Sequence, residues 1–117
     1  MIPNDEKIIY IDANPNRTCI YPESGPIEEP ILGDKTHNEA EWLALQRALD
    51  YIKTYESIEI LSDSELVVKQ FNDEYSVNVQ ELQIIKRRCK QIIALRGLDV
   101  TVRWIPREVN KAGRYLK

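Results

Sequence analysis

The sequence is poor in several residue types on which common scaffolds and sites depend. Its 117 residues include two cysteines, one histidine, one methionine and one phenylalanine. Cys19 and Cys89 are too few for a disulfide framework and do not have metal-ligand spacing, and one histidine excludes a multi-histidine metal site. No apolar run approaches the roughly 18 residues of a membrane-spanning helix. The start of the chain, residues 1–7, also lacks the basic and apolar segments of a signal peptide. We therefore expect a cytoplasmic protein with no membrane partner.

Length and composition favour one ordinary soluble domain. Hydrophobic residues make up 43% of the chain and charged residues 30%, as in globular proteins. A chain of this length can bury one sizeable core without disulfides or metals. We expect a single domain over residues 1–117, and a monomer.

The overall charge conceals a strong asymmetry along the chain. The net charge of −3 and the isoelectric point near 5.2 argue at first against a general nucleic-acid binder. However, residues 1–85 carry a net charge of −11, whereas residues 86–117 carry +8. Such an asymmetry is typical of an acidic site beside a basic rim, as an enzyme acting on a polyanion requires. The alternative is that the basic residues merely solvate one helix and one strand.

Hydrophobic patterning predicts a mixed sheet with helices. Trp42, Leu45, Leu49 and Ile52 recur at helical spacing on one face, and Asn38 is a suitable N-cap for that helix. Trp104 lies in an alternating strand pattern, and we interpret both tryptophans as packing residues. Strands are expected at residues 7–12, 18–21, 27–32, 57–61 and 99–105, and helices at 38–52, 65–71 and 78–96. Three early strands followed by alternating strands and helices indicate an α/β fold with a five-stranded mixed sheet flanked by helices.

Three acidic residues stand where such a fold places its functional sites. Asp12 ends the first strand, Asp63 ends the fourth, and Glu41 lies near the start of the first helix. Sites in α/β sheets lie at the carboxyl ends of the strands. Each acid alone is typical of a cap or turn, but three converging carboxylates repel each other and need compensation. The usual compensation is a hard divalent cation, Mg²⁺ or Mn²⁺, and two such ions can promote phosphodiester cleavage.

These acids and their surroundings resemble the ribonuclease H family, type 1, of the ribonuclease H-like superfamily. The matching stretches are Tyr10–Asp12, Thr36–Leu45, Ile60–Val68 and Trp104–Asn110. The resemblance covers essentially the whole chain in the same order of elements. It implies a ribonuclease H-like fold, with Asp12, Glu41 and Asp63 as the catalytic residues and metal ligands.

The resemblance further implies a hydrolase, an endonuclease that cleaves the RNA strand of RNA–DNA hybrids. The expected cofactor is Mg²⁺ or Mn²⁺, in two sites. Attack by an activated water, in line with the leaving oxygen, would give a 3′-hydroxyl and a 5′-phosphate. Asn38 matches a family residue whose amide contacts the nucleic-acid backbone. The basic side chains that we expect to bind phosphates are Arg87, Arg88, Arg107 and Arg114.

One family feature is missing from this sequence. The family's fourth acid follows an Asn in the closing helix, but after Asn110 either Gly113 or Arg114 stands in its place, depending on a one-residue gap. Glu65 and Glu108 are candidate substitutes. The second ion could therefore bind weakly, and three functions remain open. They are an active ribonuclease H, a non-catalytic nucleic-acid-binding module with the same fold, and a protein-interaction domain.

Overall fold

The centre of the molecule is a five-stranded mixed sheet with the strand order β3-β2-β1-β4-β5. The computed structural model describes residues 7–116, so the amino-terminal residues 1–6 discussed above lie outside the described residues. The strands are β1 (Lys7–Asn14), β2 (Arg17–Tyr21), β3 (Ile27–Pro30), β4 (Ser57–Ser62) and β5 (Asp99–Trp104). β1, β2 and β3 pair antiparallel, whereas β4 and β5 extend the sheet in parallel from β1. This arrangement confirms the predicted mixed sheet.

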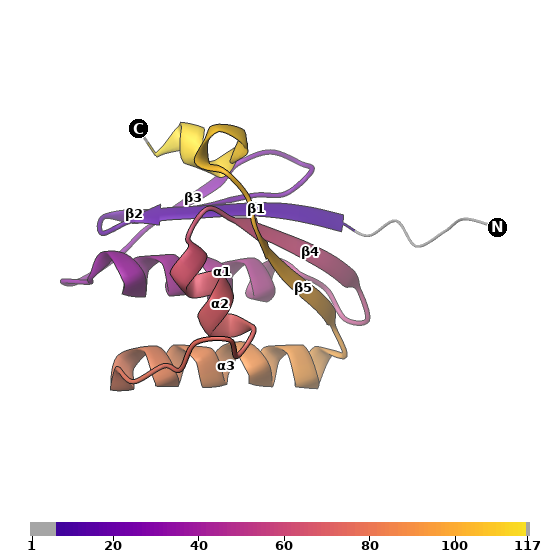
Figure 1. Cartoon of the computed structure of the whole chain (residues 1–117). Coiled ribbons are helices and arrows are strands. Elements are labelled where there is room, and N and C mark those ends of the chain that lie inside the picture. The colour runs from indigo at the N-terminus through magenta and orange to yellow at the C-terminus, as the bar shows by residue number, and fades with distance from the viewer. Residues whose placement is uncertain (1–6, 117) are drawn as a thin grey trace.

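The helices lie in layers on one side of the sheet (Figure 1). The helices are α1 (His37–Tyr51), α2 (Glu65–Phe71) and α3 (Gln80–Arg96), and the chain closes with the 3₁₀ turns η1 (Arg107–Val109) and η2 (Ala112–Tyr115). α1 packs directly on β1 and β2, and α3 packs on α1. η2 packs on β1 and β2 from the opposite face of the sheet (Figure 1). Within residues 7–116, no helix combines the length and apolarity that crossing a membrane requires.

The core forms between α1 and the sheet, as the helical stripe predicts. Trp42, Leu45 and Leu49 are fully buried, and Ile9 and Ile11 of β1 are buried in the same core. The alanines of α1 beside the stripe are also fully buried, which permits a close approach of helix and sheet. Their positions are Ala40, Ala44 and Ala48. The two cysteines are buried and free, as expected for small core residues.

The amino-terminal cap of α1 differs from our expectation. Thr36, not Asn38, is the N-cap: its hydroxyl accepts from the Glu39 amide, and the Glu39 carboxylate accepts from the Thr36 amide. This reciprocal pair is a capping box, which satisfies two amides that have no partner inside the helix. Because α1 begins earlier, Asn38 lies inside its first turn. Asn38 and Glu41 are therefore three residues apart on one helix face.

The prediction for Trp104 was also wrong. Its side chain is 49% exposed, whereas Trp42 is fully buried. Trp104 is the last residue of β5, which is an edge strand of the sheet formed by residues 7–116. Alternation along a strand shows which face a residue takes, but not whether anything covers that face.

The carboxyl end of α1 depends on a side chain from another helix. The last turn of α1 contains no basic residue. Nη1 of Arg96, at the end of α3, donates to the carbonyl oxygens of Leu49, Asp50 and Ile52 at 3.3, 2.9 and 2.9 Å. These bonds satisfy carbonyls that a helix end leaves without partners, and the positive charge suits that end of the helix dipole. Arg96 thus joins the ends of α1 and α3.

We expect replacement of Arg96 by Met to lower the free energy of unfolding by about 1.5–3 kcal/mol, the range for hydrogen bonds to charged groups. Urea unfolding at neutral pH measures this change. Arg87→Met is the matched control, because Arg87 is an exposed residue of the same helix. The control should change stability by less than about 0.5 kcal/mol. Equal stability of the two variants would contradict the role of Arg96.

Candidate functional site

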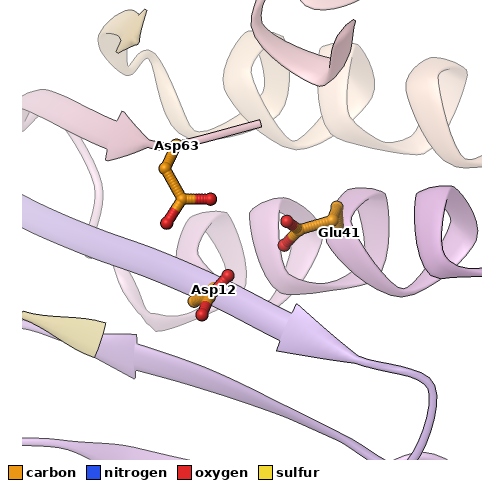
Figure 2. A group of neighbouring side chains, drawn as sticks. All are labelled: Asp12, Glu41 and Asp63. Atoms are coloured by element: carbon orange, nitrogen blue, oxygen red, sulfur yellow. The ribbon is translucent and has the colours of Figure 1, made fainter. Parts of the chain in front are cut away.

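Three carboxylates meet at the carboxyl ends of the two central parallel strands. Ile11 of β1 pairs in register with Ser62 of β4, so the next residues, Asp12 and Asp63, lie side by side. α1 packs on β1 and brings Glu41 to the same point. One carboxylate oxygen from each residue lies within 4.8 Å of the other two. Figure 2 shows the three side chains pointing into a common space from a strand, a helix and a strand end.

Burial makes this cluster electrostatically unfavourable without a cation. Glu41 is 3% exposed and Asp12 is 7% exposed. Burial, followed by the negative charges of Asp12 and Asp63, raises the pKa of Glu41 from its usual 4.5 to about 9. Burial, followed by the charge of Asp63, raises the pKa of Asp12 from 3.8 to about 6. The free site therefore holds a proton on Glu41 at neutral pH, and a divalent cation could replace that proton.

An asparagine that the sequence placed in a family-like stretch, but to which we assigned no role, holds Asp63 in place. Asn110 is 1% exposed. Its Nδ2 donates to Oδ2 of Asp63 at 3.0 Å and to the carbonyl oxygen of Ile11 at 2.9 Å. Its Oδ1 accepts from the backbone amide of Ala112 at 3.1 Å. Asn110 thus ties together β1, the end of β4 and the closing segment. The signal in the sequence was its place at the end of the family-like stretch Trp104–Asn110, since an Asn by itself is equally typical of a turn.

The closing segment decides which residue occupies the place of the missing acid. A Cβ atom added to Gly113 would lie 3.1 Å from Oδ2 of Asp12. Arg114 is exposed. Gly113 therefore borders the site, and it offers no ligand. Glu65 and Glu108 do not belong to the carboxylate cluster within residues 7–116, and Glu65 instead lies 3.9 Å from the ammonium group of Lys69.

Two cationic or potentially cationic side chains lie beside the cluster. The positive charge of Arg107 partly offsets the effect of burial on the pKa of both Asp12 and Glu41. Nε2 of His37 lies 3.8 Å from Oε2 of Glu41, one helical turn away. Both side chains are largely exposed, so both could also meet an anionic ligand.

The structure separates the other basic residues into two groups. Lys86, Lys90 and Arg96 of the basic segment bind main-chain oxygens of neighbouring elements and hold the fold together. Arg87 and Arg88 are exposed on α3, which packs on α1 rather than on the sheet. Among the described residues, no ion pair involves the predicted phosphate-binding arginines. They are Arg87, Arg88, Arg107 and Arg114. The positive charge of Arg107 lowers the pKa of both Asp12 and Glu41.

Comparison with solved structures shows which proteins share this fold. Ribonuclease H1 from the halophilic archaeon Halobacterium salinarum NRC-1 superposes with a TM-score of 0.74 at 24% identity, covering 95% of this chain and 93% of that one. LC11-RNase H1, isolated from compost by a metagenomic approach, gives a TM-score of 0.75 at 29% identity, covering 96% of this chain and 92% of that one. The structure of LC11-RNase H1 in complex with an RNA/DNA hybrid gives 0.76 at 28% identity, with coverage of 95% and 93%.

Comparison of the sequence with models of protein families also identifies a relative of ribonuclease H. The model of the family described as reverse transcriptase-like matches residues 25–116, which is most of the chain. The match includes Glu41, Asp63 and Asn110. The chain therefore belongs to the reverse transcriptase-like family within the ribonuclease H-like superfamily, as its resemblance to ribonuclease H predicted.

Proposed function

We propose that this protein is a metal-dependent endonuclease that cleaves the RNA strand of RNA–DNA hybrids. The observation that carries this proposal is the convergence of Asp12, Glu41 and Asp63 within 4.8 Å at the carboxyl ends of β1 and β4. The structural similarity to LC11-RNase H1, a protein with a structure in complex with an RNA/DNA hybrid, supports the choice of substrate.

The donor set suits a hard divalent cation. All three side chains offer oxygen, which Mg²⁺ and Mn²⁺ prefer. Among the described residues, Oε1 of Glu41 is buried without a hydrogen-bond partner, which is costly unless a ligand satisfies it. Asp12, Glu41 and Asp63 would hold the ion. When bound there, such an ion supplies Lewis acidity that activates a water and stabilises the leaving oxygen in phosphodiester cleavage.

The residues around the carboxylates would bind and orient the substrate. Asn110 fixes the direction of the Asp63 carboxylate, and a fixed ligand loses less entropy when the site is filled. Arg107 supplies positive charge beside an otherwise negative cluster and would attract a phosphate of the strand. Asn38, one turn before Glu41 on the same face of α1, would donate its amide to the strand backbone. Arg87, Arg88 and Arg114 would add phosphate contacts that weaken with salt.

One observation favours a second candidate, a nucleic-acid-binding module without catalysis. Gly113 leaves the cluster with three carboxylates where the resemblance to ribonuclease H implies a fourth acid, so a second ion would have fewer ligands. Such a module would bind hybrids with a steep salt dependence and would not hydrolyse them. Hydrolysis assays distinguish the two candidates directly.

We expect Asp63→Asn to reduce cleavage of the RNA strand in a labelled hybrid by at least about 100-fold. Removal of residues that merely support a metal ligand commonly costs about 10- to 100-fold, so loss of a ligand charge should cost at least as much. Cleavage is measured with Mg²⁺ and with Mn²⁺. Glu81→Gln, which neutralises an exposed acid of α3, is the matched control and should cleave normally. Equal cleavage by wild type and Asp63→Asn would refute the proposal.

The raised pKa of Glu41 predicts a pH-dependent stability of the metal-free protein. Between the usual pKa of 4.5 and the folded-state value of about 9, the folded protein binds more protons than the unfolded chain, so stability falls as pH rises. Glu41→Gln has nearly the shape of a protonated glutamate and stays uncharged at every pH. Its melting temperature should exceed that of wild type at about pH 8 and match it closely at about pH 4.5. Thermal melts in EDTA test this.

The same melts with added Mn²⁺ test the role of Glu41 as a ligand. Mn²⁺ should raise the melting temperature of wild type at about pH 8, because a ligand that binds the folded state stabilises it. The increase should be much smaller for Glu41→Gln. Equal shifts in the two proteins would mean that Glu41 does not hold the ion.

Restoring a carboxylate at Gly113 should strengthen cation binding. Gly113→Asp places a fourth charge beside Asp12, so we expect lower stability in EDTA and about tenfold tighter Mn²⁺ binding by calorimetry. Gly113→Asn adds nearly the same volume without the charge and serves as the control. If the Asp and Asn variants bind Mn²⁺ equally, the side chain at this position does not reach the ion.

A further inference from the structure

An exposed tryptophan is fixed directly beside the carboxylate cluster. Trp104 ends β5 in register with Ser62, the residue before Asp63. Its indole Nε1 donates to the backbone carbonyl of Asp63 at 3.1 Å. Asp63 is thus held twice, through its carboxylate by Asn110 and through its carbonyl by Trp104. The indole cannot turn away without losing its hydrogen bond.

The exposed part of this side chain is apolar. The indole N–H is the single polar group of a tryptophan, and here the main chain satisfies it. The 49% of the side chain that stays exposed is therefore mainly carbon ring surface. Single exposed apolar residues are common and need no explanation. A ring hydrogen-bonded to the backbone of a candidate metal ligand is a different case, because it adjoins a residue that the proposed substrate has to reach.

The shape of the proposed substrate indicates what this ring can touch. In a duplex, the faces of the bases are stacked on each other and are not accessible without unstacking. The wide, shallow minor groove of an A-form helix exposes sugars and their 2′-hydroxyls instead. Arg107, three residues after Trp104, adds positive charge on the approach to Asp12 and Glu41. An apolar ring next to a cation suits the alternation of sugars and phosphates along one strand.

We infer that the Trp104 ring packs against a sugar of the nucleic-acid strand bound at the carboxylate cluster and thereby positions that strand relative to Asp63. This inference rests on the proposed function, since it assumes a nucleic-acid duplex as the ligand. It assigns a substrate-binding role to a residue whose strand pattern indicated only packing.

Intrinsic fluorescence can test this contact because the chain has two tryptophans in opposite environments. Trp42 is fully buried and donates to Gln70, whereas Trp104 is half exposed. In wild type, acrylamide should quench mainly Trp104, and a saturating RNA–DNA hybrid should protect it. In Trp104→Phe, the remaining emission comes from Trp42 and should not respond to the hybrid. The titrations are done in EDTA at low salt, so that metal-dependent hydrolysis does not consume the hybrid.

Binding measured by anisotropy of a labelled hybrid gives the energetic test. We expect Trp104→Ala to weaken binding about tenfold, near the lower end of the effect of removing a ring that stacks on a base, because a sugar offers less contact area. Trp104→Phe keeps a ring but lacks the N–H, so it should lose clearly less affinity than Trp104→Ala. Tyr51→Ala is the matched control, because Tyr51 is 46% exposed and lies roughly 15 Å along α1 from Glu41. It should bind like wild type.

The outcomes separate this inference from the proposed function. If wild type binds the hybrid but acrylamide quenching is unchanged and Trp104→Ala binds equally well, the Trp104 contact is refuted while the proposed function stands. If wild type neither binds the hybrid in these titrations nor cleaves it with Mg²⁺ or Mn²⁺, both are refuted. If Trp104→Ala and Trp104→Phe weaken binding equally and the hybrid gives no protection, the role of Trp104 is limited to holding the Asp63 backbone, which also overturns the inference.

Discussion

The site depends on the parallel pairing of β1 with β4. This pairing sets Ile11 opposite Ser62 at the centre of the sheet, so that the chain continues into Asp12 and Asp63 at adjacent strand ends. A shift of one residue would turn one of the two side chains to the other face. The apolar residues of both strands fix this register, because they are buried in one hydrophobic core. Packing of the core thus determines the geometry of the acids.

The same arrangement makes the site electrostatically unfavourable, because it buries acidic side chains close together. Burial, followed by the charges of Asp12 and Asp63, raises the pKa of Glu41 to about 9, so ionising Glu41 in the metal-free protein is unfavourable at neutral pH. Hydrogen bonds around the site hold the elements that carry these acids in place. Thr36 and Arg96 cap the two ends of the helix that carries Glu41, and Asn110 ties Asp63 to the main chain of β1. A site that is unfavourable when empty is also one that a cation stabilises strongly.

The charge asymmetry of the sequence has two different structural meanings. Some of the late basic residues, such as Lys86 and Arg96, bind main-chain carbonyls and belong to the framework. Others, such as Arg107, remain near the acids or on exposed surface. A count of charges cannot separate these groups, because both kinds of residue add equally to the net charge. Because some basic residues stay exposed, a chain with a net negative charge can still bind an anionic partner.

The sequence by itself determined the order of elements, the mixed sheet and the buried stripe of α1, because these follow from local hydrophobic periodicity. It also placed Asp12, Glu41 and Asp63 at element ends that a parallel sheet brings together. The tertiary structure decided what depends on contacts between distant segments. These contacts put Asn110 on Asp63 and Gly113 beside Asp12, and they left Trp104 half exposed against the Asp63 backbone. Periodicity shows which face a residue takes, but only the folded chain shows what covers that face and which partners lie across it.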